Sequence, residues 1–195
     1  MNPTHWTRLA LALALYAPAA AMAADLAGVR LTDTAPVGGR LLRLSGAAVA
    51  TRALVLRLYV IALYLPEARA AAPADPLNSD GPRRLVITLL RDVCGQDFIE
   101  VVQKAADSRG PQRERFADYA ARLGAALSRR DCALRRGDTL AFDWLPGHGA
   151  VPRLNGAPLL EPEPDAGIYA ALLRIWLGDE PVDAALKADL LGARS

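Results

Sequence analysis

The chain has 195 residues, of which 52% are hydrophobic and 23% are charged, and its formal net charge is +2, from 23 Lys and Arg against 21 Asp and Glu. This composition is typical of one globular domain and excludes a collagen-like or intrinsically disordered chain. Because the charge is near zero and the sequence holds no basic stripe, we expect no nucleic-acid partner.

The first 24 residues have the order of a secretory signal peptide. Arg8 precedes an alternating Leu and Ala run over 9–15, and the small-residue site Ala21-Met22-Ala23 follows. The apolar run is shorter than the roughly 20 residues that a membrane span needs. We therefore predict a signal peptide over 1–24 and one exported domain over 25–195, without a membrane span once the signal is removed. The Ala-, Leu- and Arg-rich composition favours a bacterial periplasm.

Export changes the interpretation of the two cysteines. Cys94 and Cys132 both follow the signal, and an oxidising compartment permits a disulfide between them. Two free buried thiols are the alternative, because sequence spacing does not establish the Cα separation that a disulfide requires. His148 is the only histidine after the signal and lies in a turn-like Pro-Gly-His-Gly string. We therefore predict no metal site and no cofactor.

Strands are expected first along the exported domain. Residues 41–45 alternate weakly, and 54–65 form an apolar run broken only by Arg57, which predicts a strand covered on both faces. A second apolar run covers 85–90 and predicts another strand. The intervening residues 70–82 are rich in Ala, Pro and Asp, which indicates an exposed connection.

Two helices and a hairpin are expected next. Asp97 and Glu100 resemble a helix-capping pair, and Pro111 suits the first turn of an amphipathic helix, whose apolar positions are Phe116, Ala120, Leu123 and Leu127. Alternation over 140–144 and the Asn155-Gly156 turn predict a hairpin, which Pro152 and Pro158 place near a sheet edge.

The C-terminal segment is predicted to be helical. Asp165 can cap a helix over 168–177 whose only charge is Arg174, and Gly178 is a stop signal. Pro181 and Asp183 then open a short final helix. A helix that is apolar all round must be buried or must line an apolar cavity.

Reactive motifs are missing from the sequence. It contains no Gly-x-Ser-x-Gly elbow, no phosphate-binding glycine loop and no Cys-x-x-Cys pair. Asp138 and Asp143 are better explained as a turn residue and the polar face of a strand. Hydrolase chemistry therefore has little support.

Several short strings share the order and spacing of one known family. The most specific is Trp176-Leu177-Gly178-Asp179 with Pro181-Val182, followed by the ending Leu190-Leu191-Gly192. The others lie at 45–49, 58–65, 90–93 and 146–149, with Asn155-Gly156 and Leu186-Lys187. Together they resemble the exported bacterial branch of the chalcone isomerase-like family over nearly all of residues 25–192.

The resemblance implies an α+β fold, an open-faced β-sandwich in which a large antiparallel sheet carries a layer of helices, with a ligand cleft between them. Plant members that are enzymes close a chalcone to a flavanone, using an arginine together with Thr and Tyr hydroxyls. Other members bind fatty acids without catalysis, through an Arg and a Tyr at the end of an apolar tunnel. Both classes need an arginine that stays charged in an apolar cavity.

The family's site residues map onto this sequence only in part. Tyr59 falls where the enzymes have their catalytic Thr and where the fatty-acid binders have Tyr, which favours binding over cyclisation. The family's arginine position is occupied here by Ala50. Arg52 lies two residues further on and so on the same strand face, whereas a gap-free count from Gly46 selects Arg40.

Further candidates come from the same apolar run. Arg57 is expected to share a strand face with Tyr59, although it could instead reach solvent from a sheet edge. Tyr64 is a second candidate contact, and for both tyrosines the alternative is a core aromatic with a satisfied hydroxyl. No counterparts of the plant enzyme's later Tyr and Asn are found around residues 110–113.

The sequence thus predicts a periplasmic protein that binds a fatty acid or a similar flat apolar molecule with an anionic end. Arg52 or Arg57 would pair with the anion and Tyr59 would donate to it, while Leu172, Ile175 and Trp176 would form the apolar wall. The alternatives are an intramolecular lyase or isomerase acting on a phenolic enone, and an interaction module that uses only the fold.

Overall fold

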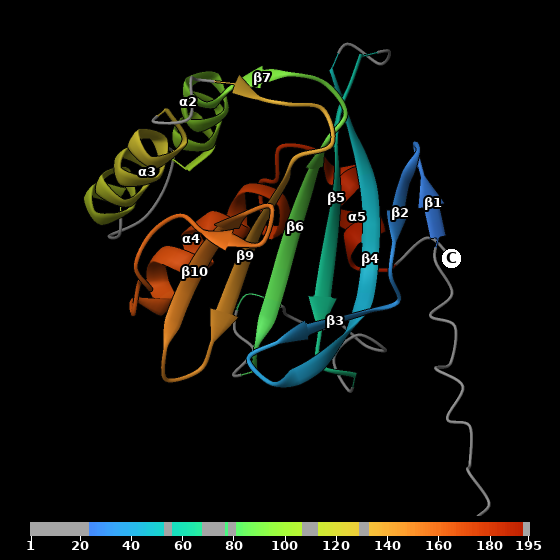
Figure 1. The fold of residues 1–195 in the computed structure, drawn as a ribbon, viewed down its shortest axis with the longest axis horizontal. Coiled ribbons are helices and arrows are strands. Elements are labelled where there is room, and N and C mark those ends of the chain that lie inside the picture. Colours follow the sequence, from blue (N-terminus) through green and yellow to red (C-terminus); the bar gives the residue numbers. More distant parts are fainter. Residues whose placement is uncertain are drawn as a thin grey trace, which may run out of the picture.

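The computed structural model describes residues 24–52, 56–67, 77, 81–106, 113–128 and 133–192. Its main element is a seven-stranded antiparallel sheet (Figure 1) in the order β11-β10-β9-β6-β5-β4-β3. The strands are β3 (Thr34–Val37), β4 (Arg40–Arg52), β5 (Leu56–Leu65), β6 (Arg83–Leu89), β9 (Thr139–Leu145), β10 (Gly149–Leu154) and β11 (Ala157–Pro158).

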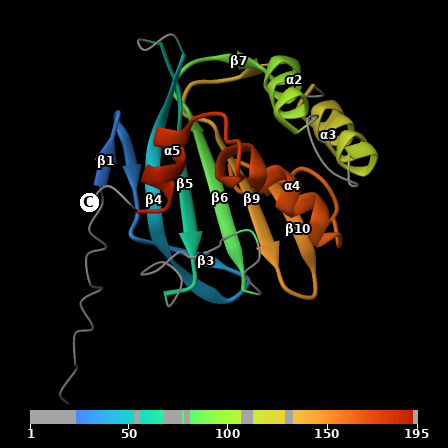
Figure 2. The ribbon, with the colours of Figure 1, turned by 180° about the vertical axis from the view of Figure 1, so that it is seen from behind.

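Helices cover one side of this sheet, as Figure 2 shows for α4 and α5. They are α2 (Gly95–Ala106), α3 (Arg113–Ser128), α4 (Ala166–Leu177) and α5 (Ala184–Leu190). Two small antiparallel sheets complete the described fold, β1 (Ala24–Leu26) with β2 (Val29–Leu31) and β7 (Val93–Cys94) with β8 (Ala133–Leu134). The arrangement confirms the predicted α+β fold with one large antiparallel sheet and a helix layer. Within the described helices, none is long and apolar enough to span a membrane.

The inner strand β5 separates two hydrophobic clusters. Ile61, Leu63 and Leu65 pack with the helices, whereas Val60, Ala62 and Tyr64 pack on the other face with residues of β2 and β3. Because successive side chains of a strand point to opposite faces, both faces must be covered to bury the whole run. The predicted two-sided burial is confirmed from Val60 to Leu65, all 4% exposed or less.

Close approach of the last helix explains the glycine in the middle of β4. A Cβ atom on Gly46 would lie 2.6 Å from the carbonyl oxygen of Leu190, at the end of α5. A β-bulge also interrupts the pairing of β4 with β5 between Leu44 and Gly46. Glycine lets the backbone of α5 rest directly on the strand, which anchors the C-terminal helix against the sheet.

The C-terminal helices follow the predicted pattern closely. The Asp165 carboxylate accepts a hydrogen bond from the Gly167 N–H at 2.8 Å, at the start of α4. Asp183 accepts from two N–H groups at the start of α5. Around α4 the large apolar side chains are buried, so the prediction of a buried all-apolar helix is confirmed.

One local prediction needs correction: α2 begins at Gly95, so Asp97 lies inside the first turn and does not cap the helix. Asp143 lies on a polar face of β9, as expected, because it accepts hydrogen bonds from Arg84 Nη2 at 2.7 Å and Arg153 Nε at 3.1 Å. It is nevertheless buried, at 2% exposure. Pairing with two cations is what permits this carboxylate to be buried. Pro111 lies outside the described residues.

Candidate functional site

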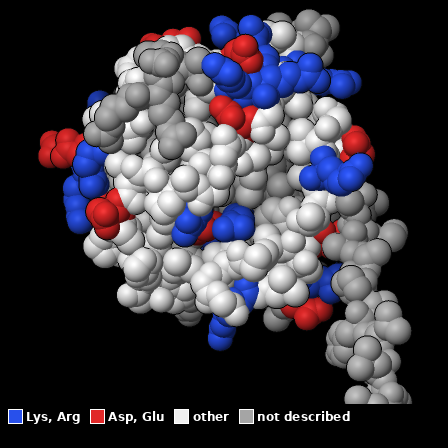
Figure 3. All heavy atoms as spheres, viewed as in Figure 1, with Lys and Arg blue, Asp and Glu red and all other residues white. Residues whose placement is uncertain are grey.

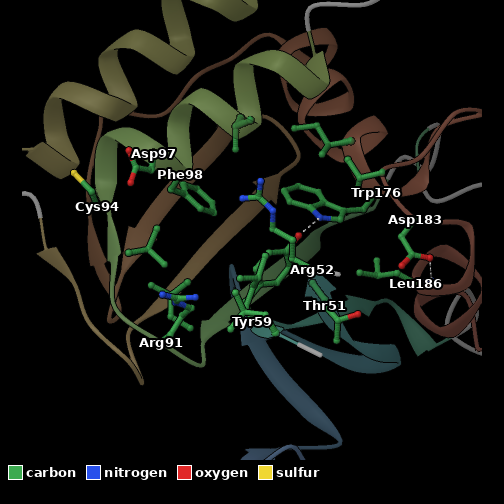
Figure 4. Close-up of a pocket in the computed structure, with 18 of the residues that line it drawn as sticks. Thr51, Arg52, Tyr59, Arg91, Cys94, Asp97, Phe98, Trp176, Asp183 and Leu186 are labelled. Carbon is green, nitrogen blue, oxygen red and sulfur yellow. Dashed lines mark hydrogen bonds between the residues drawn. The ribbon is translucent and has the colours of Figure 1, made fainter. Parts of the chain in front are cut away.

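A cavity of about 500 Å³ lies between the end of the sheet and the helices α2, α4 and α5 (Figure 4). The end of β4, the start of β5 and the end of β6 form one side, and residues of α2, α4 and α5 form the other. The volume is within the range of small-molecule sites, roughly 300–1,000 Å³. Its apolar wall includes Leu58, Leu89, Phe98, Val102, Ile175 and Leu186.

A bulge in β5 determines which side chains enter the cavity. Ala50 pairs with Tyr59, but the next residue of β4, Thr51, pairs with Arg57, so Leu58 is an extra residue. Leu58 and Tyr59 therefore both line the cavity although they are consecutive. The expectation that Arg57 shares the face of Tyr59 assumed regular alternation and is not met, because Arg57 is exposed and does not line the cavity.

Tyr59 and Trp176 form a hydrogen-bonded pair in the wall, from positions 117 residues apart. The indole Nε1–H of Trp176 donates to the Tyr59 hydroxyl oxygen at 3.0 Å, and Trp176 is only 2% exposed. Burial raises the pKa of the Tyr59 hydroxyl above its ordinary value of 10.0, Asp183 adds to the rise, and the bond from Trp176 opposes it. The hydroxyl therefore stays protonated at neutral pH and can donate a hydrogen bond to a ligand in the cavity.

Two arginines line the cavity without an ion-pair partner among the described residues. Arg52 is the last residue of β4 and pairs with Leu56 across the ladder, and Figure 4 shows its side chain reaching into the cavity. Arg91 follows β6 and lines the same space. The sequence predicted a ligand contact for Arg52 but none for Arg91. Its position directly after an apolar strand was the available signal, since side chains there lie at the sheet end.

The lining also holds three aspartates, and two of them already have backbone partners. Asp92 accepts from the Arg136 N–H at 2.8 Å, and Asp183 caps α5. Asp97 lies in the first turn of α2, where the helix dipole favours a negative charge. These carboxylates hold the loop after β6 and the starts of two helices in place, while the two arginines remain available to a ligand.

The remaining candidate residues lie elsewhere in the fold. Arg40 lines a separate pocket of about 440 Å³ with His148, at the other end of β4. Tyr64 faces the opposite cluster, and its hydroxyl donates to the carbonyl of Thr32 at 3.0 Å. Leu172 is buried in the core, whereas Ile175 lines the cavity. Of the eight residues predicted for the site, the cavity brings together Arg52, Tyr59, Ile175 and Trp176.

The predicted disulfide and the predicted absence of a metal remain sequence-based. Cys94 is partly buried in the cavity lining, and Cys132 lies outside the described residues, so the disulfide and the alternative of two free thiols both stay predictions. In the described ranges, no cluster of three His, Cys, Asp or Glu side chains is arranged to hold a metal ion.

Comparison with known proteins identifies the family. A solved structure of a fatty-acid binding protein from Arabidopsis thaliana has a TM-score of 0.67 to this chain at 13% identity, with 88% of this chain and 96% of that chain covered. At that identity the likeness concerns the fold. No curated protein shows a significant sequence match. The model of the family described as chalcone isomerase-like matches residues 23–192, and the chain therefore belongs to the chalcone isomerase-like family.

Proposed function

We propose that this protein binds a fatty acid or a similar apolar molecule with an anionic end, without catalysis, after export to the bacterial periplasm. One observation carries the proposal: a largely apolar cavity holds Arg52, which has no ion-pair partner among the described residues, together with the Tyr59 hydroxyl, which accepts from Trp176 and can still donate. The fatty-acid binding function of the Arabidopsis thaliana protein of the same fold supports it.

The apolar wall can supply most of the binding free energy. Each methylene transferred from water contributes about 0.8 kcal/mol, so ten buried methylenes contribute about 8 kcal/mol. Lost rotational and translational freedom opposes binding by about 4–15 kcal/mol. A long acyl chain is therefore needed for useful affinity, and short carboxylic acids are expected to bind poorly.

The polar groups determine how the ligand is oriented. A guanidinium and a carboxylate form charge-assisted hydrogen bonds, which are about twice as strong as neutral ones. The planar guanidinium of Arg52 matches the geometry of a carboxylate, and the raised pKa of Tyr59 keeps its hydroxyl a donor. We place the carboxylate between these two groups and the acyl chain along Phe98, Ile175 and Leu186.

Ligand binding can be tested on protein purified without detergent. Mass spectrometry of extracted lipids should detect a retained long-chain acid, and added fatty acids should displace a fluorescent acyl probe. Arg52→Ala and Tyr59→Phe should weaken binding, whereas Arg40→Ala, which changes a separate pocket, should not. Loss of affinity in Arg40→Ala alone, or failure of any long-chain acid to bind, would refute the proposed site.

Catalysis and export have separate tests. If the protein only binds, the visible absorbance of an added chalcone should not decay faster than in buffer; turnover that Arg52→Ala abolishes would instead establish an intramolecular lyase. Export predicts that the protein is recovered in the periplasmic fraction with residues 1–24 removed, which N-terminal sequencing measures. Recovery of the uncut chain in the cytoplasm would contradict this part of the proposal.

A further inference from the structure

Five exposed arginines gather at the end of the molecule where the cavity opens. They come from the end of β4, the start of β5, the loop after β6 and the turn between β8 and β9, and Figure 3 shows Lys and Arg side chains concentrated over this end. We call this set the arginine patch, and its members are Arg52, Arg57, Arg91, Arg135 and Arg136.

Backbone contacts make the patch one continuous surface. Arg57 faces Thr51 across the ladder of β4 and β5, and the Leu90 N–H donates to the Leu58 carbonyl at 3.0 Å, next to Arg91. The turn that carries Arg135 and Arg136 is tied to the same loop, because the Arg136 N–H donates to Asp92 at 2.8 Å. The arginines therefore belong to one sheet end.

The patch has a strong positive excess for a protein of almost neutral charge. Asp92 and Asp138 are its acidic neighbours, and both accept backbone hydrogen bonds, from Arg136 and Arg135 respectively. The five arginines and these two aspartates together have a formal net charge of 5 − 2 = +3, which exceeds the net charge of +2 of the whole chain. The acidic side chains Asp97 and Asp183 come from the helix side of the opening, so the positive field belongs to the sheet side.

An apolar side chain lies within this charged surface. The structure describes three exposed large hydrophobic residues, of which Leu56 (42% exposed) and Val182 (52%) line the cavity, and Leu41 lies at the far end of β4. Leu56 pairs directly with Arg52. Exposed apolar groups surrounded by arginines are the combination that binds the interface of an anionic membrane.

We propose that the arginine patch docks on anionic phospholipid bilayers with Leu56 in the headgroup region, so that the cavity opens toward the membrane surface. The arginines pair with the anionic lipid headgroups. Leu56 and Val182, the exposed apolar residues of the cavity lining, then let an amphipathic ligand pass between the bilayer and the cavity without crossing water. This inference concerns the exchange surface and holds for any membrane-derived ligand that the cavity takes. A protein or nucleic-acid partner for the patch is an alternative that the experiment separates.

The test measures sedimentation of the whole chain with vesicles of phosphatidylcholine, with and without phosphatidylglycerol. Each arginine near an anionic surface contributes about fivefold to partitioning, so Arg135→Gln with Arg136→Gln should lower it roughly 30-fold. The matched control, Arg30→Gln with Arg40→Gln, removes the same charge from β2 and from the far end of β4 and should change little. Every variant carries the same apolar N-terminal residues 1–24. Any contribution of those residues to vesicle binding is therefore equal in all variants, and the differences between variants measure the contribution of the arginine patch.

Further variants and conditions show whether the patch binds a membrane, and separate membrane binding from fatty-acid binding in the cavity. Leu56→Ser should weaken vesicle binding and Leu41→Ser should not, and added salt should release the protein. Tyr59→Phe should reduce binding of a fatty-acid probe while leaving vesicle binding unchanged. Equal losses in the two arginine pairs, binding to neutral vesicles as strong as to anionic ones, or binding to an RNA oligonucleotide but not to vesicles would overturn the proposal.

Discussion

Replacing Tyr59 by Phe removes one oxygen atom, which stabilises the fold through Trp176 and contacts the ligand in the proposed site. The oxygen accepts the hydrogen bond from Trp176 at 3.0 Å, and Trp176 is 2% exposed, so the variant leaves a buried N–H without its acceptor. An unsatisfied buried donor costs about 1–3 kcal/mol. The free energy of unfolding should fall by that amount, and Tm should fall by about 2–4 °C for each kcal/mol in a domain of this size.

The same oxygen donates to the ligand in the proposed site. A hydrogen bond to a charged group contributes about 1.5–3 kcal/mol, so Tyr59→Phe should weaken fatty-acid binding by about 10- to 150-fold. Urea unfolding measures the first effect and displacement of an acyl probe measures the second. In a Trp176→Phe background the stability cost of Tyr59→Phe should nearly vanish, because the donor is gone, while the affinity loss should persist.

Tyr64→Phe is the matched control, because it removes the same atom on the opposite face of the sheet. Its hydroxyl donates to the Thr32 carbonyl at 3.0 Å, away from the cavity, so stability should fall slightly and affinity should not change. The reasoning fails if Tyr64→Phe weakens the ligand as much as Tyr59→Phe does. It also fails if Tyr59→Phe leaves both the unfolding free energy and the affinity at their original values.

Other predictions follow from single features of the fold. Gly46→Ala should lower Tm, since the added Cβ would displace α5 from β4. Because Leu186 of α5 lines the cavity, ligand affinity should also fall. Unchanged hydrogen-exchange protection of the α5 amides would contradict this prediction. Asp143→Ala leaves Arg84 without its buried partner and should lower the unfolding free energy by about 3–5 kcal/mol, measured in urea; a loss below 1 kcal/mol, the range of exposed ion pairs, would show that the pair is solvated. Burial raises the pKa of Tyr119 and of Tyr169, so the folded state binds these protons more tightly than the unfolded state. The contribution of these two tyrosines to stability should therefore be constant below the ordinary tyrosine pKa of 10.0 and fall as pH rises above it. A Tyr169→Phe variant should show a shallower fall above that pH; an unchanged slope would exclude Tyr169 as its source.

Local chemistry in the sequence was sufficient for most of the elements. The capping aspartates, the Asn155-Gly156 turn and the all-apolar helix α4 are each decided by residues within a few positions of one another. The two-sided burial of β5 followed from an unbroken apolar run. Arg52 and Tyr59 could be identified as candidates because strand periodicity and the family resemblance both depend only on residues that are close together in the sequence.

The tertiary structure alone decided how the site is assembled. The bulge at Leu58 altered the strand alternation and separated Arg57 from Tyr59, and a bulge depends on the partner strand. Trp176 meets Tyr59 across 117 residues, and the five arginines come together because four separate segments of the chain meet at one end of the sheet. Sequence thus determines the local elements, whereas contacts between distant segments determine the cavity, because packing is not encoded in any one stretch of the chain.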